Sequence, residues 1–369
     1  SHFLLKACDC FLQKYYKIVS CSSKYNIMRF KFYPFFLFIF SSFIFTCEKE
    51  ETQAEVIPPR NRVEQQLSDM DTLQNYLNNH YFNSGALEAL SSYPQISDIE
   101  ITELVVGETL PPGKTLLIDA VEEKQTMYEG VDYSYYILTI KQGQGEHPHF
   151  TDQVRVNYEG FLTNNTSFDS SISSLDFDLS NVITGWNRVL PQFKTSDGYV
   201  TNSDGTVRFD NYGIGMMFLP SGLAYFNAAS PGVTSYSCLI FKFELHQYKV
   251  MDHDNDYIPS YMEDLDANKD IYNDDTDADL VSNFLDTDDD GDGFSTFREV
   301  IALDLTDTSL EGLSTQIQSF EPLGSNQLFT PLVTADDGTF SVKLITLEDT
   351  NGNGIPNYLD AGDTGTLDN

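Results

Sequence analysis

The feature that most constrains the fold is a set of short segments in which apolar and polar residues alternate. Val154, Val156 and Tyr158 alternate with charged and amide side chains, and residues 239–245 combine larger apolar groups with Lys242 and Glu244. A period of two predicts strands with one buried and one exposed face. Together these segments predict an antiparallel sheet in the middle of the chain.

An amphipathic helix is expected before this sheet. Apolar residues there recur at steps of three and four, which places them on one helical face. They are Val63, Leu67, Met70, Leu73, Leu77 and Tyr81. This spacing predicts a helix that packs on the following domain, and the expected fold class is α+β.

Charge is distributed very unevenly along the 369 residues. The formal net charge is −35, and all but one of the 56 acidic residues lie at or after Cys47. A surface of this sign repels phosphate backbones, so we expect no direct nucleic-acid binding. Divalent cations are the partners that so many carboxylates favour.

The first part of the chain has the pattern of an export signal. Arg29 and Lys31 precede an apolar run that ends near Cys47, which predicts a secretory signal with Met28 as its start. The residues before Cys47 resemble a bacterial lipobox. This resemblance implies lipidation of Cys47 and an outer-membrane lipoprotein, periplasmic or surface facing, held to the membrane by its lipid. A plain signal peptide and a membrane anchor are the alternatives.

Three groups of residues follow one another in the middle of the chain. They are 154–160 with Phe168-Asp169-Ser170-Ser171, then Val182-Ile183-Thr184-Gly185-Trp186, then Leu223-Ala224-Tyr225 with 239–245. Together they resemble the FKBP-type peptidyl-prolyl cis-trans isomerases, over roughly residues 131–248. The resemblance implies a bent antiparallel sheet wrapped around one short helix, with an aromatic pocket between them.

The resemblance also implies the residues of that pocket and their roles. They are Tyr158, Phe168, Asp169, Val182, Ile183, Trp186, Tyr225 and Phe241. Trp186 would form the floor, and the Ile183 backbone N–H and the Tyr225 hydroxyl would hold substrate carbonyls. Asp169 would be a buried carboxylate that orients the site. Proline-containing polypeptides are the expected partners, and catalysis is expected to need no cofactor.

The chain departs from the family pattern in three places. Phe226 stands where the family has a glycine, the loop 227–237 lacks the usual Ile-Pro ending with Val233 as its nearest apolar residue, and residues 195–211 form an insertion. An FKBP-like fold that binds weakly or not at all therefore remains an alternative to an active isomerase.

The composition changes abruptly after Tyr248. From Asp252 to Glu299 there are 17 acidic residues, against Lys269 and Arg298. Twelve-residue calcium loops place oxygen ligands at positions 1, 3, 5 and 12 and glycine at position 6. Five segments have this oxygen spacing, and two of them also have the glycine. The expected ligands are Asp252, Asp254, Asp256 and Glu263; Asp264, Asp266, Asn268 and Asp275; Asp275, Asp277, Asp279 and Asp286; Asp288, Asp290, Asp292 and Glu299; and Asp349, Asn351, Asn353 and Asp360.

These loops resemble thrombospondin type 3 and related bacterial calcium repeats, which implies structural calcium. The alternative is a disordered acidic linker, because like charges repel and extend a chain. Between the outer loops, residues 328–347 predict a hairpin that turns at Asp337-Gly338.

The sequence thus predicts an isomerase that assists the folding of exported proteins, anchored in the cell envelope and stiffened by calcium. The alternatives are a non-catalytic FKBP-like binding module and a calcium-dependent surface spacer or adhesin. The expected divisions are an upstream and signal sequence (1–46), a tether (47–62), a helical segment (63–100), the isomerase-like domain (101–248), calcium repeats (249–300), and a C-terminal region with a hairpin and a further loop (301–369).

Overall fold

The computed structural model describes residues 58–335 and 337–363. The expected signal sequence, the lipidation site Cys47 and most of the tether lie outside these residues. Among the helices of the described part, none combines the length and the apolar character that crossing a membrane requires.

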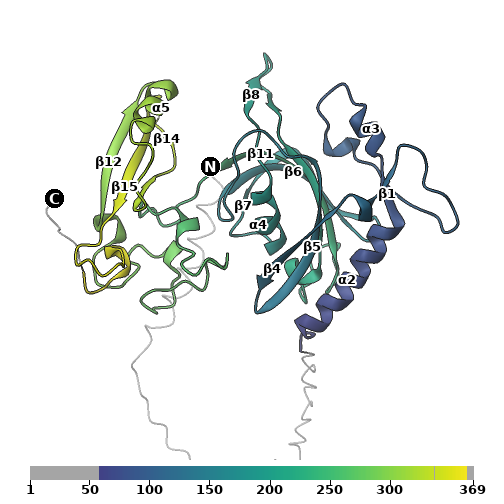
Figure 1. The fold of residues 1–369 in the computed structure, drawn as a ribbon, viewed down its shortest axis with the longest axis horizontal. Coiled ribbons are helices and arrows are strands. Elements are labelled where there is room, and N and C mark those ends of the chain that lie inside the picture. The colour runs from purple at the N-terminus through teal and green to yellow at the C-terminus, as the bar shows by residue number, and fades with distance from the viewer. Residues whose placement is uncertain (1–57, 336, 364–369) are drawn as a thin grey trace, which may run out of the picture. The chain divides into compact units, whose positions relative to one another are not determined.

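A six-stranded antiparallel sheet forms the centre of the fold, with strand order β4-β5-β10-β11-β6-β7 (Figure 1). One short helix, α4 (Thr184–Val189), packs on one face of this sheet. The expected α+β fold, a bent antiparallel sheet around a short helix, is confirmed. The strands are β4 (Glu122–Tyr128), β5 (Val131–Lys141), β6 (Gln153–Leu162), β7 (Ser167–Asp178), β10 (Gly213–Leu219) and β11 (Leu239–Lys249).

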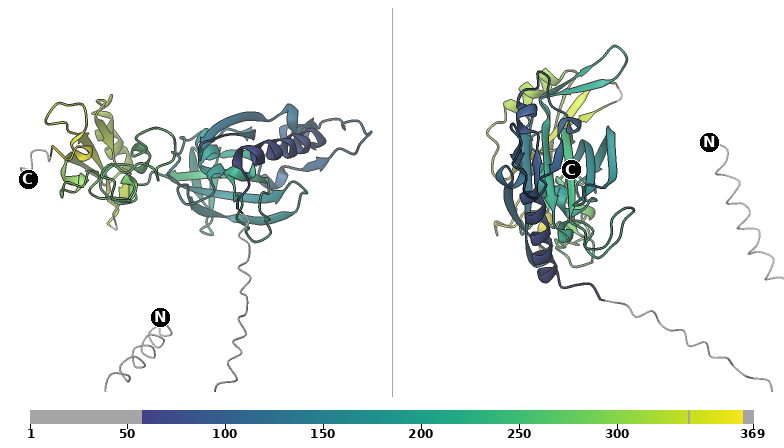
Figure 2. Two further views of the ribbon diagram at one scale, coloured as in Figure 1. Left: turned by 90° about the horizontal axis from the view of Figure 1, so that it is seen from below. Right: turned by 90° about the vertical axis from the view of Figure 1, so that its right-hand side faces the viewer.

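Helix α2 (Arg62–Asn79) covers the opposite face, so the sheet is buried on both sides (Figures 1 and 2). The helix begins where the Asn61 side chain accepts the N–H groups of Val63 and Glu64. Leu73 and Leu77 are fully buried. The expected apolar face is wrong for the first turns, because Val63 and Leu67 are exposed and polar residues take the inner positions.

Polar side chains are buried in the first half of α2 because their partners lie on the sheet domain. The Gln66 amide donates to the Ser134 carbonyl at 3.4 Å, and Asp69 accepts both the N–H and the hydroxyl of Ser221. These contacts need the tertiary fold, and no helical period of apolar residues could reveal them.

A small three-stranded sheet, a short helix and a two-stranded ribbon complete this part of the chain. β1 (His80–Phe82) pairs with β2 (Ile101–Glu103) and β3 (Thr115–Leu116), next to the short helix α3 (Ser84–Glu88). The insertion at 195–211 is a two-stranded ribbon. Its strands are β8 (Gly198–Thr201) and β9 (Val207–Asp210).

The last part of the chain contains a smaller antiparallel sheet. The expected hairpin forms, since β14 (Val333–Thr334) pairs with β15 (Phe340–Leu347) across a turn in which Gly338 has a φ of +84°. The remaining elements are β12 (Val300–Asp307), α5 (Leu310–Gln318) and β13 (Gln327–Phe329). Between β11 and β12, residues 250–299 form consecutive loops joined by short 3-10 turns.

Candidate functional site: an aromatic pocket and a series of carboxylate loops

Trp186 is the centre of an aromatic cluster between α4 and the sheet. Its ring centroid lies 5.7 Å from that of Tyr158 on β6 and 5.0 Å from that of Phe241 on β11. Phe168 on β7 meets Phe241 edge-on at 5.6 Å. Edge-on and tilted pairs are the geometry that aromatic quadrupoles prefer. The sheet curvature thus brings together four of the residues that the sequence places in the pocket.

Phe177, which the sequence analysis did not identify, belongs to the same cluster. It lies 5.3 Å from the Tyr158 ring and 5.4 Å from the Trp186 ring. The signal available in the sequence is the alternation of Leu175 and Phe177 with Asp176 and Asp178. That alternation predicts a strand but does not say which partner the strand pairs with.

Gly160 allows two of these rings to lie against strand β6. A Cβ atom at this position would come within 2.7 Å of Phe168 Cζ and 2.7 Å of Phe241 Cε1. Distances below 3.0 Å are too short for real Cβ atoms, so any side chain here would displace the two rings. The absence of a side chain at Gly160 therefore allows the two rings to pack on β6.

Tyr158 and Asp169 form the polar edge of the cluster. The Tyr158 hydroxyl donates to Asp169 Oδ2 at 2.6 Å. Burial, together with the neighbouring Asp169 carboxylate, raises the pKa of Tyr158 well above its usual range, so the phenol stays protonated. The expectation that Asp169 is buried is wrong: it is an exposed residue, because β7 is an edge strand of the sheet and no further strand covers it.

Val182, Ile183 and Tyr225 lie at the rim. All three are half-buried and pack against the core that contains Trp186. Ile183 is the N-cap residue of α4, and its carbonyl accepts the Trp186 N–H at 3.0 Å. Val233, from the loop that lacks the Ile-Pro ending, is buried in the same core. The rim thus keeps an apolar wall.

Phe226 stands where the family pattern has glycine, and its backbone keeps the positive φ that glycine favours. Its φ is +48°, in the left-handed region, which costs a non-glycine residue about 1–2 kcal/mol. The buried ring meets Tyr236 edge-on at 5.1 Å, and the Arg62 guanidinium lies 4.2 Å from its centroid. These contacts offset the strain.

Two residues of α2 hold the turn that precedes Tyr225. Arg62 Nη1 donates to the Gly222 carbonyl at 3.4 Å, and Asp69 Oδ2 accepts the Ser221 N–H at 2.8 Å. Burial raises the pKa of Asp69, although its bonds to Ser221 and Gln65 oppose this. Helix α2 therefore holds the turn before Tyr225 from the far face of the sheet.

Five loops in the acidic region share one backbone conformation. In each loop, positions 4 and 6 have a positive φ, although six of these ten residues are not glycine. The pairs are Asn255 and Tyr257, Ala267 and Lys269, Ala278 and Leu280, Gly291 and Gly293, and Gly352 and Gly354. The loops without the glycine thus adopt the same turn as the two loops that have it.

The hydrogen bonds of the five loops also repeat. The N–H of position 6 donates to the aspartate at position 1: Tyr257 to Asp252 at 3.2 Å, Lys269 to Asp264 at 2.9 Å, Leu280 to Asp275 at 3.1 Å, Gly293 to Asp288 at 3.1 Å and Gly354 to Asp349 at 2.8 Å. The N–H of position 7 donates to the side chain of position 5: Ile258 to Asp256, Asp270 to Asn268, Val281 to Asp279, Phe294 to Asp292 and Ile355 to Asn353. These bonds hold the side chains of positions 1 and 5 against the backbone in the same way in every loop.

Carboxylates converge in four groups, in each of which one oxygen of every residue lies within 4.8 Å of the others. Three groups follow the expected spacing closely. They are Asp264 with Asp266 and Asp274; Asp275 with Asp277 and Asp279; and Asp288 with Asp290 and Asp292. Asp274 takes the place expected for Asp275 in the second loop, because Asp275 is already the first residue of the third.

The last positions of three loops interact with other side chains of the same loop. Burial and the neighbouring Asp290 and Asp292 raise the pKa of Glu299 to about 8. Burial and the loop carboxylates likewise raise the pKa of Asp286. Asp360 accepts the side-chain amides of Asn351 and Asn353 at 2.9 and 2.6 Å. Oxygen ligands of this kind, and in this number, suit a hard divalent cation.

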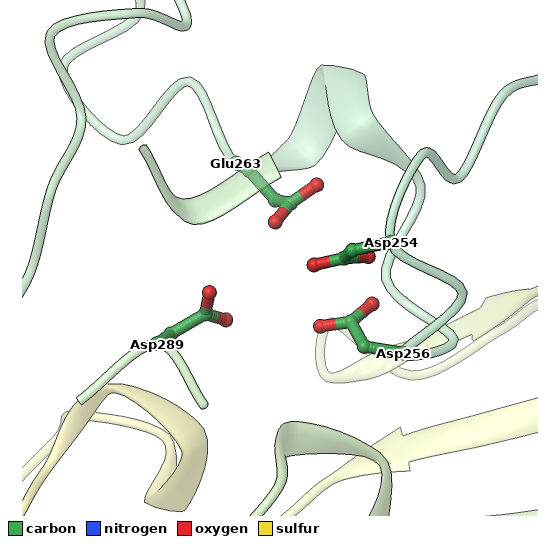
Figure 3. Close-up of side chains that lie close together, drawn as sticks. All are labelled: Asp254, Asp256, Glu263 and Asp289. Atoms are coloured by element: carbon green, nitrogen blue, oxygen red, sulfur yellow. The ribbon is translucent and has the colours of Figure 1, made fainter. Parts of the chain in front are cut away.

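The first loop differs from the others. Asp254, Asp256 and Glu263 converge with Asp289, which comes from the fourth loop (Figure 3). Asp252 lies outside this group, and its two oxygens accept the N–H groups of Asn255 and Tyr257. The twelve-residue spacing could not indicate Asp289, because position 2 is not a ligand position.

Two family models match the chain. Residues 144–246 match the model described as FKBP-type peptidyl-prolyl cis-trans isomerase, and residues 253–328 match the model described as BamM C-terminal. The first match covers the aromatic cluster, and the second covers three of the carboxylate loops and all but the first residue of a fourth.

Individual relatives agree with the first match. The chain is 33% identical over 129 residues to the peptidyl-prolyl cis-trans isomerase Mip of Coxiella burnetii, which is 34% of this chain and 47% of that protein. It is 25% identical over 208 residues to the FKBP-type isomerase FkpA of Escherichia coli K12, or 51% of this chain and 70% of that protein. The chain thus spans about half the length of Mip.

A solved structure of the same kind is the crystal structure of FkpA from Escherichia coli. It is 30% identical, covers 35% of this chain and 51% of that chain, and has a TM-score of 0.27. The family match, the relatives and the position of the aromatic cluster all fall on the same part of the chain. Residues 144–246 are an FKBP-type peptidyl-prolyl cis-trans isomerase domain.

Proposed function

We propose that this protein is a peptidyl-prolyl cis-trans isomerase that acts on exported polypeptides. The observation that carries the proposal is the packing of Trp186 against Tyr158, Phe241 and Phe177, within the domain that matches the isomerase family. An apolar floor with aromatic walls can receive a proline ring by excluding water from it.

The reaction needs shape and environment rather than a nucleophile. An X–Pro bond isomerises slowly because amide resonance must be broken, with a barrier of about 20 kcal/mol. The twisted amide has lost its charge separation, so an apolar cavity favours it over the planar amide. The Ile183 N–H and the Tyr225 hydroxyl at the rim would hold the carbonyls that flank the bond, and the Tyr158–Asp169 hydrogen bond would keep one wall in place.

An isomerisation assay on proline peptides with the purified chain tests this proposal. We expect Tyr225→Phe to lower kcat/KM by about tenfold, because one hydrogen bond of ~1.4 kcal/mol is lost in the transition state. Tyr199→Phe is the matched control, since Tyr199 lies on the β8 ribbon and is exposed. Absence of turnover by the wild-type chain would leave a non-catalytic FKBP-like binding module as the better description.

The same proposal includes location and clients. The basic and apolar pattern before Cys47 supports export and lipidation at that cysteine, and hence a membrane anchor in the cell envelope. Mass spectrometry of the mature protein would identify a lipid on Cys47. An unmodified N-terminus elsewhere would favour the plain signal peptide.

We further propose that the acidic region binds calcium as a structural ion. The supporting observations are that all five loops share one backbone turn, including the three without glycine at position 6, and that carboxylates from the first four loops converge in four groups. Without cations, these carboxylates would repel one another. If calcium binds but the pocket does not turn over peptides, a calcium-dependent surface spacer or adhesin becomes the favoured role.

A further inference from the structure

The most unusual group of charges in the described residues joins two loops that are separated in sequence. Asp254, Asp256 and Glu263 belong to the first loop, whereas Asp289 follows the first residue of the fourth. One oxygen of each lies within 4.8 Å of the others. Figure 3 shows Asp289 reaching from a separate segment and facing the other three carboxylates across a gap.

These carboxylates are buried and largely without protein partners. The exposed fraction is 0% for Asp256 and 1% for both Glu263 and Asp289. Six oxygens have no hydrogen-bond partner in the described part of the chain: both of Asp254, both of Glu263, one of Asp256 and one of Asp289. Burying ionised carboxylates without a counter-charge is strongly unfavourable. The arrangement therefore requires a positively charged partner.

The oxygens that do have partners are the ones turned away from the gap. Asp256 Oδ1 accepts the Ile258 N–H at 2.7 Å, and Asp289 Oδ2 accepts the Thr296 hydroxyl at 3.2 Å. These bonds fix both carboxylates so that the remaining oxygen of each points inwards. None of the ion pairs in the described residues supplies a lysine or arginine to the group.

The donor set selects the kind of cation. It consists only of carboxylate oxygens, which suit hard ions rather than the softer metals that prefer nitrogen and sulfur. Calcium takes six to eight oxygens and often a bidentate glutamate in the last loop position, which is the position of Glu263. The six oxygens without a hydrogen-bond partner equal the lower limit of the calcium coordination number, so no water ligand is required.

We propose that one calcium ion binds between the first and fourth loops, with Asp254, Asp256, Glu263 and Asp289 as its protein ligands. This inference rests on the calcium binding proposed above and assigns a ligand that no loop spacing contains. The ion would connect residues 252–263 directly to residues 288–299. The second and third loops would then form a closed segment, because the ion joins the loops on either side of them.

The surroundings of the group favour such a closure. Ile258 is fully buried, and Tyr358 from the fifth loop is 4% exposed in the same apolar cluster. The Ile258 N–H donates to Asp256 Oδ1 at 2.7 Å, so this apolar cluster begins directly beside the carboxylates. The ion would therefore lie against the small apolar core of the C-terminal region and be shielded from water.

The test is to count calcium ions on the purified full chain by native mass spectrometry and to measure their affinities by calorimetry. We expect Asp289→Asn to bind one ion fewer than wild type, or to bind it at least about tenfold more weakly, because one charged ligand is lost. The amide oxygen at this position still accepts the Thr296 hydroxyl. Glu311→Gln on α5 is the control, since it removes the same charge from an exposed residue.

The possible results separate this inference from the proposal on which it rests. A wild-type chain that binds no calcium overturns both. If wild type binds calcium and Asp289→Asn binds the same number with unchanged affinities, the ion between the loops is refuted and the other loops stand. Should the variant fail to fold, crystals of the wild-type chain grown with calcium decide the question, because an anomalous peak must lie between Asp254 and Asp289.

Discussion

In the sheet domain most of the buried side chains are apolar, whereas in residues 250–299 many of them are carboxylates. The sheet separates two apolar clusters of 19 and 17 buried residues, centred on α4 and on α2. The C-terminal region has clusters of only five and three. Apolar burial stabilises the first region without help. The second has far less buried apolar surface, so the proposed calcium ions would contribute a larger share of its stability.

The largest expected effect comes from removing calcium. With chelator, we expect the C-terminal region to expand by charge repulsion while the sheet domain stays folded. Each site at a free ion concentration of 100 times its Kd contributes about 2.7 kcal/mol to stability, and chelation removes that contribution. Small-angle scattering reports on the expansion, and the fluorescence of Trp186 reports on the sheet domain alone, because the chain has no other tryptophan.

Two results would contradict this contrast between the regions. Scattering that is the same in chelator and in millimolar calcium would mean that the loops hold their shape without ions. Loss of the native Trp186 emission in chelator would mean that the two regions unfold together. Their contacts, such as His253 Nε2 with Asp178 at 3.2 Å, would then be strong enough to couple them.

A change inside the aromatic pocket should affect only the sheet domain. Gly160→Ala places a methyl group against Phe168 and Phe241, so we expect a destabilisation of about 1–3 kcal/mol and a fall in isomerase activity. Calcium binding should not change. Urea denaturation followed at Trp186, together with the peptide assay, measures both effects.

Gly198→Ala on β8 provides the matched control, because a Cβ atom there has no neighbour within 4 Å. If both variants lose the same amount of isomerase activity, the loss does not come from displacing the rings of Phe168 and Phe241. The assignment of Gly160 to the pocket would then be wrong.

The smallest effect is expected in the loops. Leu280 has a φ of +80° and is 93% exposed, so Leu280→Gly removes strain of about 1 kcal/mol without loss of packing. We expect calcium to bind the third loop about fivefold more tightly, as measured by calorimetry, with no change at Trp186. Leu285→Gly, outside the left-handed region, should weaken binding instead. An affinity lowered by both changes would show that the turn is not strained.

Strand patterns and motif order were sufficient to predict the sheet domain. Alternation at Val154, Val156 and Tyr158 predicted β6, and the family resemblance carried by the order of the motifs implied one short helix. Phe177 and the exposure of Asp169 could not be predicted in this way. Both depend on how β7 lies across β6, where the pairing register shifts twice.

In the acidic region, spacing predicted the loops but not all the groups that they form. Regular oxygens at positions 1, 3 and 5 were enough to indicate five turns, because a cation loop needs them at those places. The positive φ of Tyr257, Lys269 and Leu280 is a conformation that these residue types rarely adopt. Only the hydrogen bonds to the first aspartate of each loop explain it.

Periodicity in the sequence was enough to predict β6, β11 and the recurring oxygens of the acidic loops, because these are local properties with a fixed spacing. The tertiary structure alone decided that Asp69 and Arg62 of α2 hold the turn before Tyr225, and that Asp289 joins a group begun at Asp254. Each of these contacts joins residues far apart in the chain. Local periodicity carries no information about them, since only the folded sheet and the stacked loops bring such residues within a few ångströms.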